Sequence, residues 1–353
     1  MADLRSYLEH AVTHHASDLF IVAGCPVSEK IERHIHLVEE KKLFPPDTEQ
    51  LIREIYTLAQ RSMDHYLDTG DDDFSFAIPG LSRFRVNAYR QRNSLAAVVR
   101  VVSFEIPKWE DIHIPAQVMD LADITHGMIL FTGTAGSGKS TTQACIIDRI
   151  NRTRDCHIIT LEDPIEYLHK NQRSIVSQRE IAIDTADYLS ALRSCLRQAP
   201  DVILLGEMRD PETIRTAITA AETGHTVIAT MHTKGAVNAI ERMIDSFSGT
   251  HQAQIRFQLA NVLRTVVSQQ MIPDKCGNVI PAFELMHINS AIRGMIREKK
   301  DHQIENAIIA GRAEGMLSMD QSILSLYKAG MITKEIALSY ADHPDQLARH
   351  IGG

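Results

Sequence analysis

Alternation of apolar and polar positions in the first hundred residues predicts an α+β domain. In the segment that follows Ser82, the residues Phe84, Val86 and Ala88 share one face of a strand, which leaves Arg83 and Arg85 on the other. Helical spacing of apolar residues, apolar runs and alternation together predict helices over 1–15 and 49–67 and strands over 18–24, 71–77 and 82–102. The domain therefore displays a row of arginines.

The pattern changes after two prolines, Pro107 and Pro115, which disfavour regular structure. Short apolar strands are then expected to alternate with helices: strands over 128–131, 157–161, 202–205 and 226–230, helices over 140–151, 188–196 and 211–222. This alternation predicts a parallel sheet with helices on both faces, and from about residue 236 the chain is expected to be mostly helical. We expect an N-terminal domain over 1–103, a linker over 104–115 and a second domain over 116–353.

Composition narrows the function classes. Hydrophobic residues make up 44% of the chain and charged residues 23%, as in soluble globular proteins. The net charge of −8 argues against a protein that coats nucleic acid. No run approaches the roughly 18 apolar residues that span a bilayer, so we expect a cytoplasmic protein that meets a membrane only through a partner. The five scattered cysteines are typical of reduced thiols.

One segment, Gly133-Thr-Ala-Gly-Ser-Gly-Lys-Ser140, matches the phosphate-binding loop G-x-x-x-x-G-K-[ST] between an expected strand and helix. Its glycines let successive backbone N–H groups turn toward a phosphate, and the helix N-terminus adds positive potential. Lys139 would reach the terminal phosphates, and the Ser140 hydroxyl would ligate Mg²⁺. The candidate nucleotide-binding residues are Gly133, Thr134, Ala135, Gly136, Ser137, Gly138, Lys139, Ser140 and Thr141.

Two acids follow apolar strands downstream of this loop. Glu162 follows the expected strand 157–161, and Glu207 follows the expected strand 202–205. Because ligands of open parallel sheets sit beyond the carboxyl ends of the strands, both acids would face the phosphates. One could hold Mg²⁺ and the other could activate water. Taken alone, each acid would fit a structural role, as a helix N-cap or a surface charge, as well as it fits a catalytic role.

Three further segments resemble boxes of the secretion and pilus ATPase superfamily: 160–166 its Asp box, 200–210 its atypical Walker B box and 223–233 its His box. The resemblance implies an α/β fold in which a PAS-like α+β domain precedes a RecA-like P-loop domain with a helical C-terminal region. It implies that Glu162 is the general base and that Glu207 joins Ser140 in acting on Mg²⁺. It further implies that His225 and His232 sense the γ-phosphate or couple it to a neighbouring subunit.

The same resemblance extends to the arginine row, which is similar to a set that includes arginine fingers acting in trans: Arg83, Arg85, Arg90, Arg92 and Arg100. Relatives often have an arginine followed by glycine where this chain has Asn93-Ser94, with Arg92 one place earlier. The identity of the finger therefore stays open, as does the interpretation of the row as a solvated strand face.

Residues 291–298 resemble the AIRNLIRE box of PilT-type retraction motors, with Gly294 and Met295 in place of Asn-Leu. Extension and secretion motors typically carry a tetracysteine zinc insertion, whereas this chain has only Cys276 in that region. Both points favour a retraction motor over a pilus extension or type II secretion ATPase. A nucleic-acid translocase and a non-enzymatic binding module are further alternatives, and the net charge and the intact loop and acids argue against them.

The family resemblance also implies partners and location. These are ATP and Mg²⁺, a homo-hexamer, an inner-membrane pilus platform protein and, indirectly, pilin. The protein would act in the cytoplasm at the inner face of the membrane, without nucleic acid. Residues 333–353 carry no motif that indicates chemistry.

Overall fold

The computed structural model describes residues 3–31, 34–102 and 105–351. The chain divides into two compact units, with the main boundary between Glu105 and Ile106 and with residues Glu166–Leu168 counted with the first unit. Residues 106–115, expected as a linker, belong to the second unit, where Ile114 is buried and Trp109 and Ile112 pack against the core.

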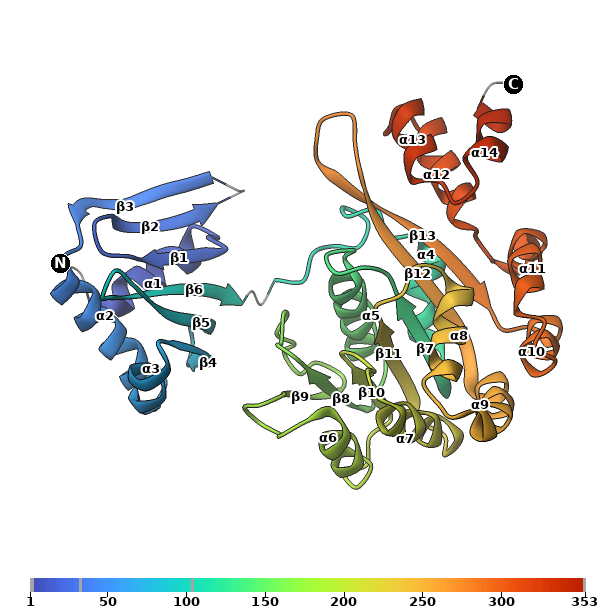
Figure 1. Ribbon diagram of the computed structural model, residues 1–353, viewed down its shortest axis with the longest axis horizontal. Coiled ribbons are helices and arrows are strands. Elements are labelled where there is room, and N and C mark those ends of the chain that lie inside the picture. Colours follow the sequence, from blue (N-terminus) through green and yellow to red (C-terminus); the bar gives the residue numbers. More distant parts are fainter. Residues whose placement is uncertain (1–2, 32–33, 103–104, 352–353) are drawn as a thin grey trace. The chain divides into compact units, whose positions relative to one another are not determined.

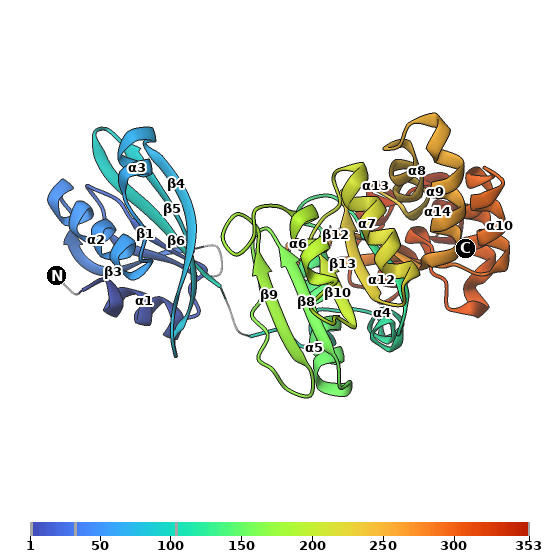
Figure 2. The same ribbon diagram turned by 90° about the horizontal axis from the view of Figure 1, so that it is seen from below.

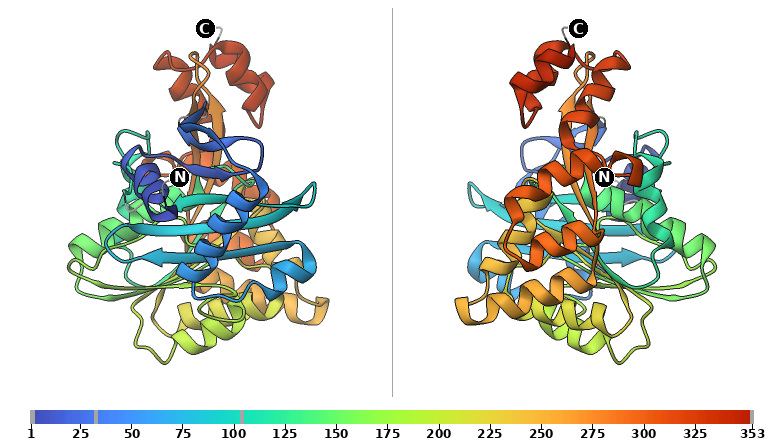
Figure 3. Two further views of the ribbon diagram at one scale, coloured as in Figure 1. Left: turned by 90° about the vertical axis from the view of Figure 1, so that its left-hand side faces the viewer. Right: turned by 90° about the vertical axis from the view of Figure 1, so that its right-hand side faces the viewer.

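The first unit is a six-stranded antiparallel sheet with helices on one face (Figures 1 and 3). The strand order is β3-β2-β1-β6-β5-β4, with bounds β1 (Asp18–Ile21), β2 (Pro26–Ile31), β3 (His34–Lys42), β4 (Asp71–Ile78), β5 (Ser82–Gln91) and β6 (Ser94–Val102). The helices are α1 (Leu4–Thr13), α2 (Pro45–Leu58) and α3 (Asp64–Thr69). Leu8 of α1 and Leu51 of α2 pack with Leu19 and Val86 of the sheet in one core.

Three expectations for this unit need correction. The segment 49–67 is two helices, since Gln60 has a positive φ of 52° and ends the first. The hairpin of β2 and β3 was missed, because β3 is largely exposed and lacks an alternating pattern. The segment 82–102 is a hairpin whose two-residue turn is Arg92-Asn93, both at positive φ, as a type I′ turn requires.

The second unit is built on a seven-stranded sheet in the order β13-β12-β7-β11-β10-β8-β9 (Figure 1). Figure 2 shows β9 beside β8 at one edge of this sheet. Its strands are β7 (Gly127–Thr132), β8 (His157–Glu162), β9 (Ile175–Glu180), β10 (Val202–Leu205), β11 (Thr226–Met231), β12 (Leu263–Pro273) and β13 (Val279–His287). β7 to β12 pair in parallel, and β13 is antiparallel. Burial on both faces explains the continuous apolar runs.

Helices cover both faces of this sheet. One face packs on α4 (Ala116–Met119) and α5 (Lys139–Thr153). The other packs on α6 (Tyr188–Cys195), α7 (Pro211–Glu222), α8 (Ala236–Asp245) and α9 (Gly249–Val262). The expected α/β architecture is thereby confirmed.

The expectation that the chain is mostly helical after residue 236 is wrong over 263–287. There β12 and β13 form a long hairpin (Figure 1), because β12 pairs with β7 and extends the central sheet. Its outer part packs through Ile272 and Ile280 on the C-terminal helices. These helices are α12 (Met319–Lys328), α13 (Lys334–Tyr340) and α14 (Pro344–Ile351), whereas α10 (Ser290–Arg297) and α11 (Ile304–Ala310) pack in the core of α6 to α9. Among the described residues no helix is both long and apolar enough to cross a bilayer.

Candidate active site

The phosphate loop leaves β7 and enters α5 at the carboxyl edge of the sheet. Gly133 has a φ of 146°, and a Cβ there would lie 2.3 Å from the carbonyl oxygen of Gln269, so only glycine fits. Gly138, at a φ of 82°, is the N-cap of α5. The buried Lys139 donates from Nζ to the carbonyls of Gly133 and Thr134, each at 2.8 Å. The lysine is therefore held over its own loop.

Neighbouring strands brace this loop. The Thr132 hydroxyl hydrogen-bonds to Thr233 after β11. On α5, Thr142 donates to the Gln269 side chain at 2.9 Å, and Gln143 donates to the Thr230 hydroxyl at 2.8 Å. A shift of the segment after β11 must therefore be felt at the phosphate loop.

Glu207 lies beyond the end of β10 and is only 7% exposed. Its Oε1 is 2.6 Å from Nε of Arg209, and its Oε2 is 3.3 Å from Nε2 of His232, which follows β11. The hydrogen bond to Glu207 raises the pKa of Arg209. The structure thus brings Glu207 and His232 together, and it adds Arg209, which no sequence motif had assigned to the acid.

Glu162 is the last residue of β8 and is partly exposed. Its Oε1 accepts from the Thr160 hydroxyl at 2.6 Å and from Nε2 of Gln178 at 3.3 Å. These two donors fix the carboxylate at the same sheet edge as Glu207, because β8 and β10 pair in parallel with Leu161 opposite Leu205.

Tyr188 is a site residue that sequence reasoning missed. Its hydroxyl would lie 2.8 Å from a Cβ placed on Gly206, which leaves no room for a side chain between β10 and Glu207. Burial, followed by the charges of Glu207, Asp163 and Glu162, raises the pKa of Tyr188. The phenol therefore stays protonated beside the acids. A single tyrosine at the start of a helix carries no signal in the sequence.

A cavity of about 320 Å³ adjoins the phosphate loop. It is lined by Gly138, Thr141 and Thr142 of the loop and α5, by Gln269 and Met271 of β12, and by residues 111–114. A purine base and its sugar are of the size that such a cavity admits. The sequence did not foretell this cavity, because it depends on the unexpected hairpin.

The structure does not place His225 with the phosphate loop. This residue precedes β11 at the opposite edge of the sheet, where its carbonyl accepts from Gly127 N, at the start of β7, at 3.0 Å. Its Nδ1 is 2.9 Å from the Ala220 carbonyl. The length of β11 separates it from His232 by roughly 20 Å. Within one subunit His225 therefore cannot contact a phosphate on the loop, and coupling to a neighbour stays a prediction.

The five candidate arginines lie on β5, on β6 and in the turn between them. Arg85 forms a two-pronged pair with Asp73, with Nη2 to Oδ2 at 2.6 Å, and Arg100 Nε lies 2.9 Å from Asp18 Oδ1. Arg85 and Arg100 are opposite each other in the β5–β6 ladder. Arg83 is half-buried, whereas Arg90 and Arg92 are exposed.

Comparison with known proteins places this site in a family. The family described as "Type II/IV secretion system protein" matches residues 1–349. The chain belongs to that family. The type IV pilus retraction ATPase PilT of Pseudomonas aeruginosa is 39% identical over 97% of this chain and 99% of its own length. A twitching motility protein of Neisseria gonorrhoeae is 38% identical over 93% of this chain and 87% of its own.

A solved structure, the pilus retraction motor PilT with bound ADP, superposes with a TM-score of 0.89 at 40% identity. It covers 99% of this chain and 100% of that one. These findings confirm the resemblance to PilT-type motors, the fold class and the assignment as an ATPase of this family. The bound ADP in that relative supports nucleotide binding in this family.

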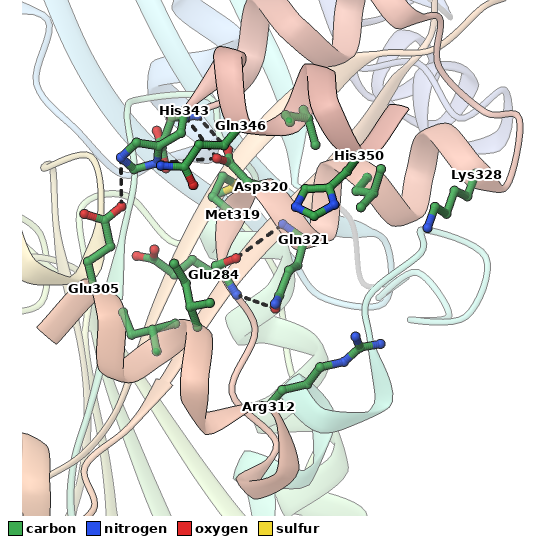
Figure 4. Close-up of a pocket in the computed structure, with 16 residues that line it drawn as sticks. Glu284, Glu305, Arg312, Met319, Asp320, Gln321, Lys328, His343, Gln346 and His350 are labelled. Atoms are coloured by element: carbon green, nitrogen blue, oxygen red, sulfur yellow. Dashed lines mark hydrogen bonds and ion pairs between the residues drawn. The ribbon is translucent and has the colours of Figure 1, made fainter. Parts of the chain in front are cut away.

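The C-terminal helices of this family member enclose a second cavity of about 320 Å³ (Figure 4). At its wall, Nε2 of His343 lies 3.3 Å from Oε1 of Glu305, and Nδ1 of His343 lies 3.5 Å from Oδ2 of Asp320. Lys234, two residues after His232, lies 2.9 Å from Asp342. The C-terminal segment is therefore tied to the end of β11.

Glu284 of β13 lines the same cavity and is 8% exposed. Its Oε1 accepts from Ala236 N, at the start of α8, at 2.7 Å. Burial, with the charges of Asp342, Glu305 and Asp320 adding to it, raises the pKa of Glu284 to about 7.

We predict that Glu284→Gln gains stability relative to the wild type as the pH rises. In the folded wild type the Glu284 carboxyl keeps its proton to a higher pH than it does in the unfolded chain. The free energy of unfolding of the wild type therefore falls as the pH rises to about 7. Glutamine does not titrate, so the variant should gain about 2 kcal/mol between about pH 5 and pH 8. Urea unfolding of the full chain measures this gain, with Glu241→Gln on α8 as control. A difference that does not change with pH would contradict the assignment.

Proposed function

We propose that this chain is an ATP-driven motor that retracts type IV pili. The observation that carries the proposal is similarity to PilT over nearly the whole of both chains. The geometry of the second unit also supports it, because the phosphate loop, Glu207 and Glu162 all lie at one edge of the sheet.

Each site residue then has a role. Lys139, already positioned by the carbonyls of Gly133 and Thr134, binds the terminal phosphates and neutralises charge that develops during transfer. The donors available for Mg²⁺ are the Ser140 hydroxyl and the Glu207 carboxylate, hard oxygen ligands of the kind that this ion prefers. Bound Mg²⁺ supplies neutralisation of the β- and γ-phosphate oxygens.

Glu162 serves as the general base in this proposal. Thr160 and Gln178 both donate to its Oε1, and these hydrogen bonds orient the carboxylate that accepts a proton from the attacking water. His232, in contact with Glu207, senses the γ-phosphate and transmits its loss along the segment that ends at Lys234. Lys234 and Asp342 pass that change to the C-terminal helices.

We further propose a homo-hexamer whose ATP sites are completed by arginines of a neighbouring subunit. Closure and reopening of successive sites would act on an inner-membrane platform protein and, through it, on pilin. The motor would act at the cytoplasmic face of that membrane. Arg85 and Arg100 are held by acids, whereas Arg90 and Arg92 are exposed and form no ion pair within the described part of the chain, so they would reach a neighbour at the least cost.

Mixing two inactive variants tests the sites completed in trans. Subunits with Glu162→Gln lack the base but keep the arginines, and subunits with one arginine changed to alanine keep the base. Random mixing joins an intact base to an intact arginine at one interface in four, so about a quarter of the wild-type ATPase rate should return. Each of the five arginines is tested in turn. Suppose that an arginine variant is inactive alone but that no mixture with Glu162→Gln regains ATPase activity. That result would contradict the proposal that a neighbouring subunit completes the site.

Surface pili distinguish retraction from extension. In the strain that encodes this chain, Lys139→Ala should leave excess pili and abolish twitching, because fibres are assembled but not withdrawn. Electron microscopy of surface pili measures this outcome. Loss of pili would instead assign the chain to extension, and unchanged pili with impaired secretion would assign it to type II secretion.

A further inference from the structure

Three metal-ligating side chains converge in the first unit, and none of them is among the residues assigned to ATP. His10 lies on α1, and His14, one turn later, is the C-cap of that helix. Glu29 lies on β2. One potential ligand atom from each lies within 4.8 Å of the other two. A helix and a strand distant in sequence thus present two imidazoles and a carboxylate to one point.

The distances suit a small divalent ion. The Nδ1 atom of His10 is 3.1 Å from Oε2 of Glu29. Two donors about 2.1 Å from a tetrahedral zinc ion are about 3.4 Å apart. The two imidazole rings are stacked with centroids 3.9 Å apart and planes inclined by 26°. Since His14 is exposed, an ion can reach the three ligands from solvent.

The surroundings also prepare the ligands. The Nδ1 atom of His14 is 2.9 Å from the carbonyl oxygen of His10, and this contact directs a proton to Nδ1. The lone pair of His14 Nε2 is then available, which is how a backbone carbonyl commonly orients a metal-binding histidine. Glu29 is only 4% exposed, and its Oε2 contacts Nδ1 of His10, so the carboxylate is held where the imidazoles meet.

We infer that His10, His14 and Glu29 form a binding site for a borderline divalent metal ion, with zinc as the matching probe. Two nitrogens and one carboxylate oxygen are a known zinc ligand set, with a fourth position open to water. The ion would join α1 to β2 and so fix the helix on the sheet. This inference does not depend on the proposed motor function.

The test is zinc titration of the full chain, without an affinity tag, by isothermal calorimetry. Wild type should bind zinc, and His14→Ala should weaken that binding at least about tenfold, since removal of even a supporting group costs that much. His14 is exposed, so its loss spares the fold. Glu29→Gln, which keeps the side chain's shape, should weaken binding in the same way. His65→Ala on α3, another exposed histidine of this unit, should bind as the wild type does.

Hydrogen exchange locates the ion. Zinc should slow amide exchange in α1 and β2 of the wild type and of His65→Ala, and leave exchange in His14→Ala unchanged. Equal zinc affinity in His14→Ala and wild type would overturn the assignment. So would zinc binding that leaves exchange in α1 and β2 unaffected, because the ion would then lie elsewhere.

Discussion

The parallel register of four strands is the constraint on which the active site depends. β7, β11, β10 and β8 pair side by side, with Thr132 opposite Met231 and Leu205 opposite both Ala229 and Leu161. Because the four strands run the same way, whatever follows each of them reaches one edge. The phosphate loop, His232, Glu207 and Glu162 are therefore neighbours, although about 100 residues of sequence separate the start of the loop from His232.

Charge at that edge is balanced by short-range partners. Lys139 is held by carbonyl oxygens, and Glu207 by Arg209 on one oxygen and His232 on the other. These contacts hold the charged groups at the edge, and in the proposed reaction phosphate oxygens would replace the carbonyl partners of Lys139. The chain beyond His232 continues into Lys234 and its ion pair with Asp342. Two residues of chain and one ion pair thus connect His232 to the segment between α13 and α14.

Sequence predicts the parts of this site that follow from local patterns. The glycine loop and the acids after apolar strands need only strand order and direction, and each is found at the expected edge. Other parts depend on contacts that no local pattern records. The hairpin of β12 and β13 depends on pairing with β7 and supplies Gln269, which closes over Gly133. His225 and His232 both belong to the segment 223–233, which resembles the His box. Because β11 lies between them, the two histidines are at opposite edges of the sheet. Tyr188 reaches Gly206 only through packing.

The most direct test of the active site is the steady-state ATPase rate of the full chain with Lys139→Ala, beside Lys275→Ala as an exposed control. We predict that the wild type and Lys275→Ala hydrolyse Mg-ATP at similar rates, and that Lys139→Ala is at least about 100-fold slower with an unchanged circular dichroism spectrum. Hydrolysis by Lys139→Ala at the wild-type rate would contradict the assignment of the reaction to this sheet edge.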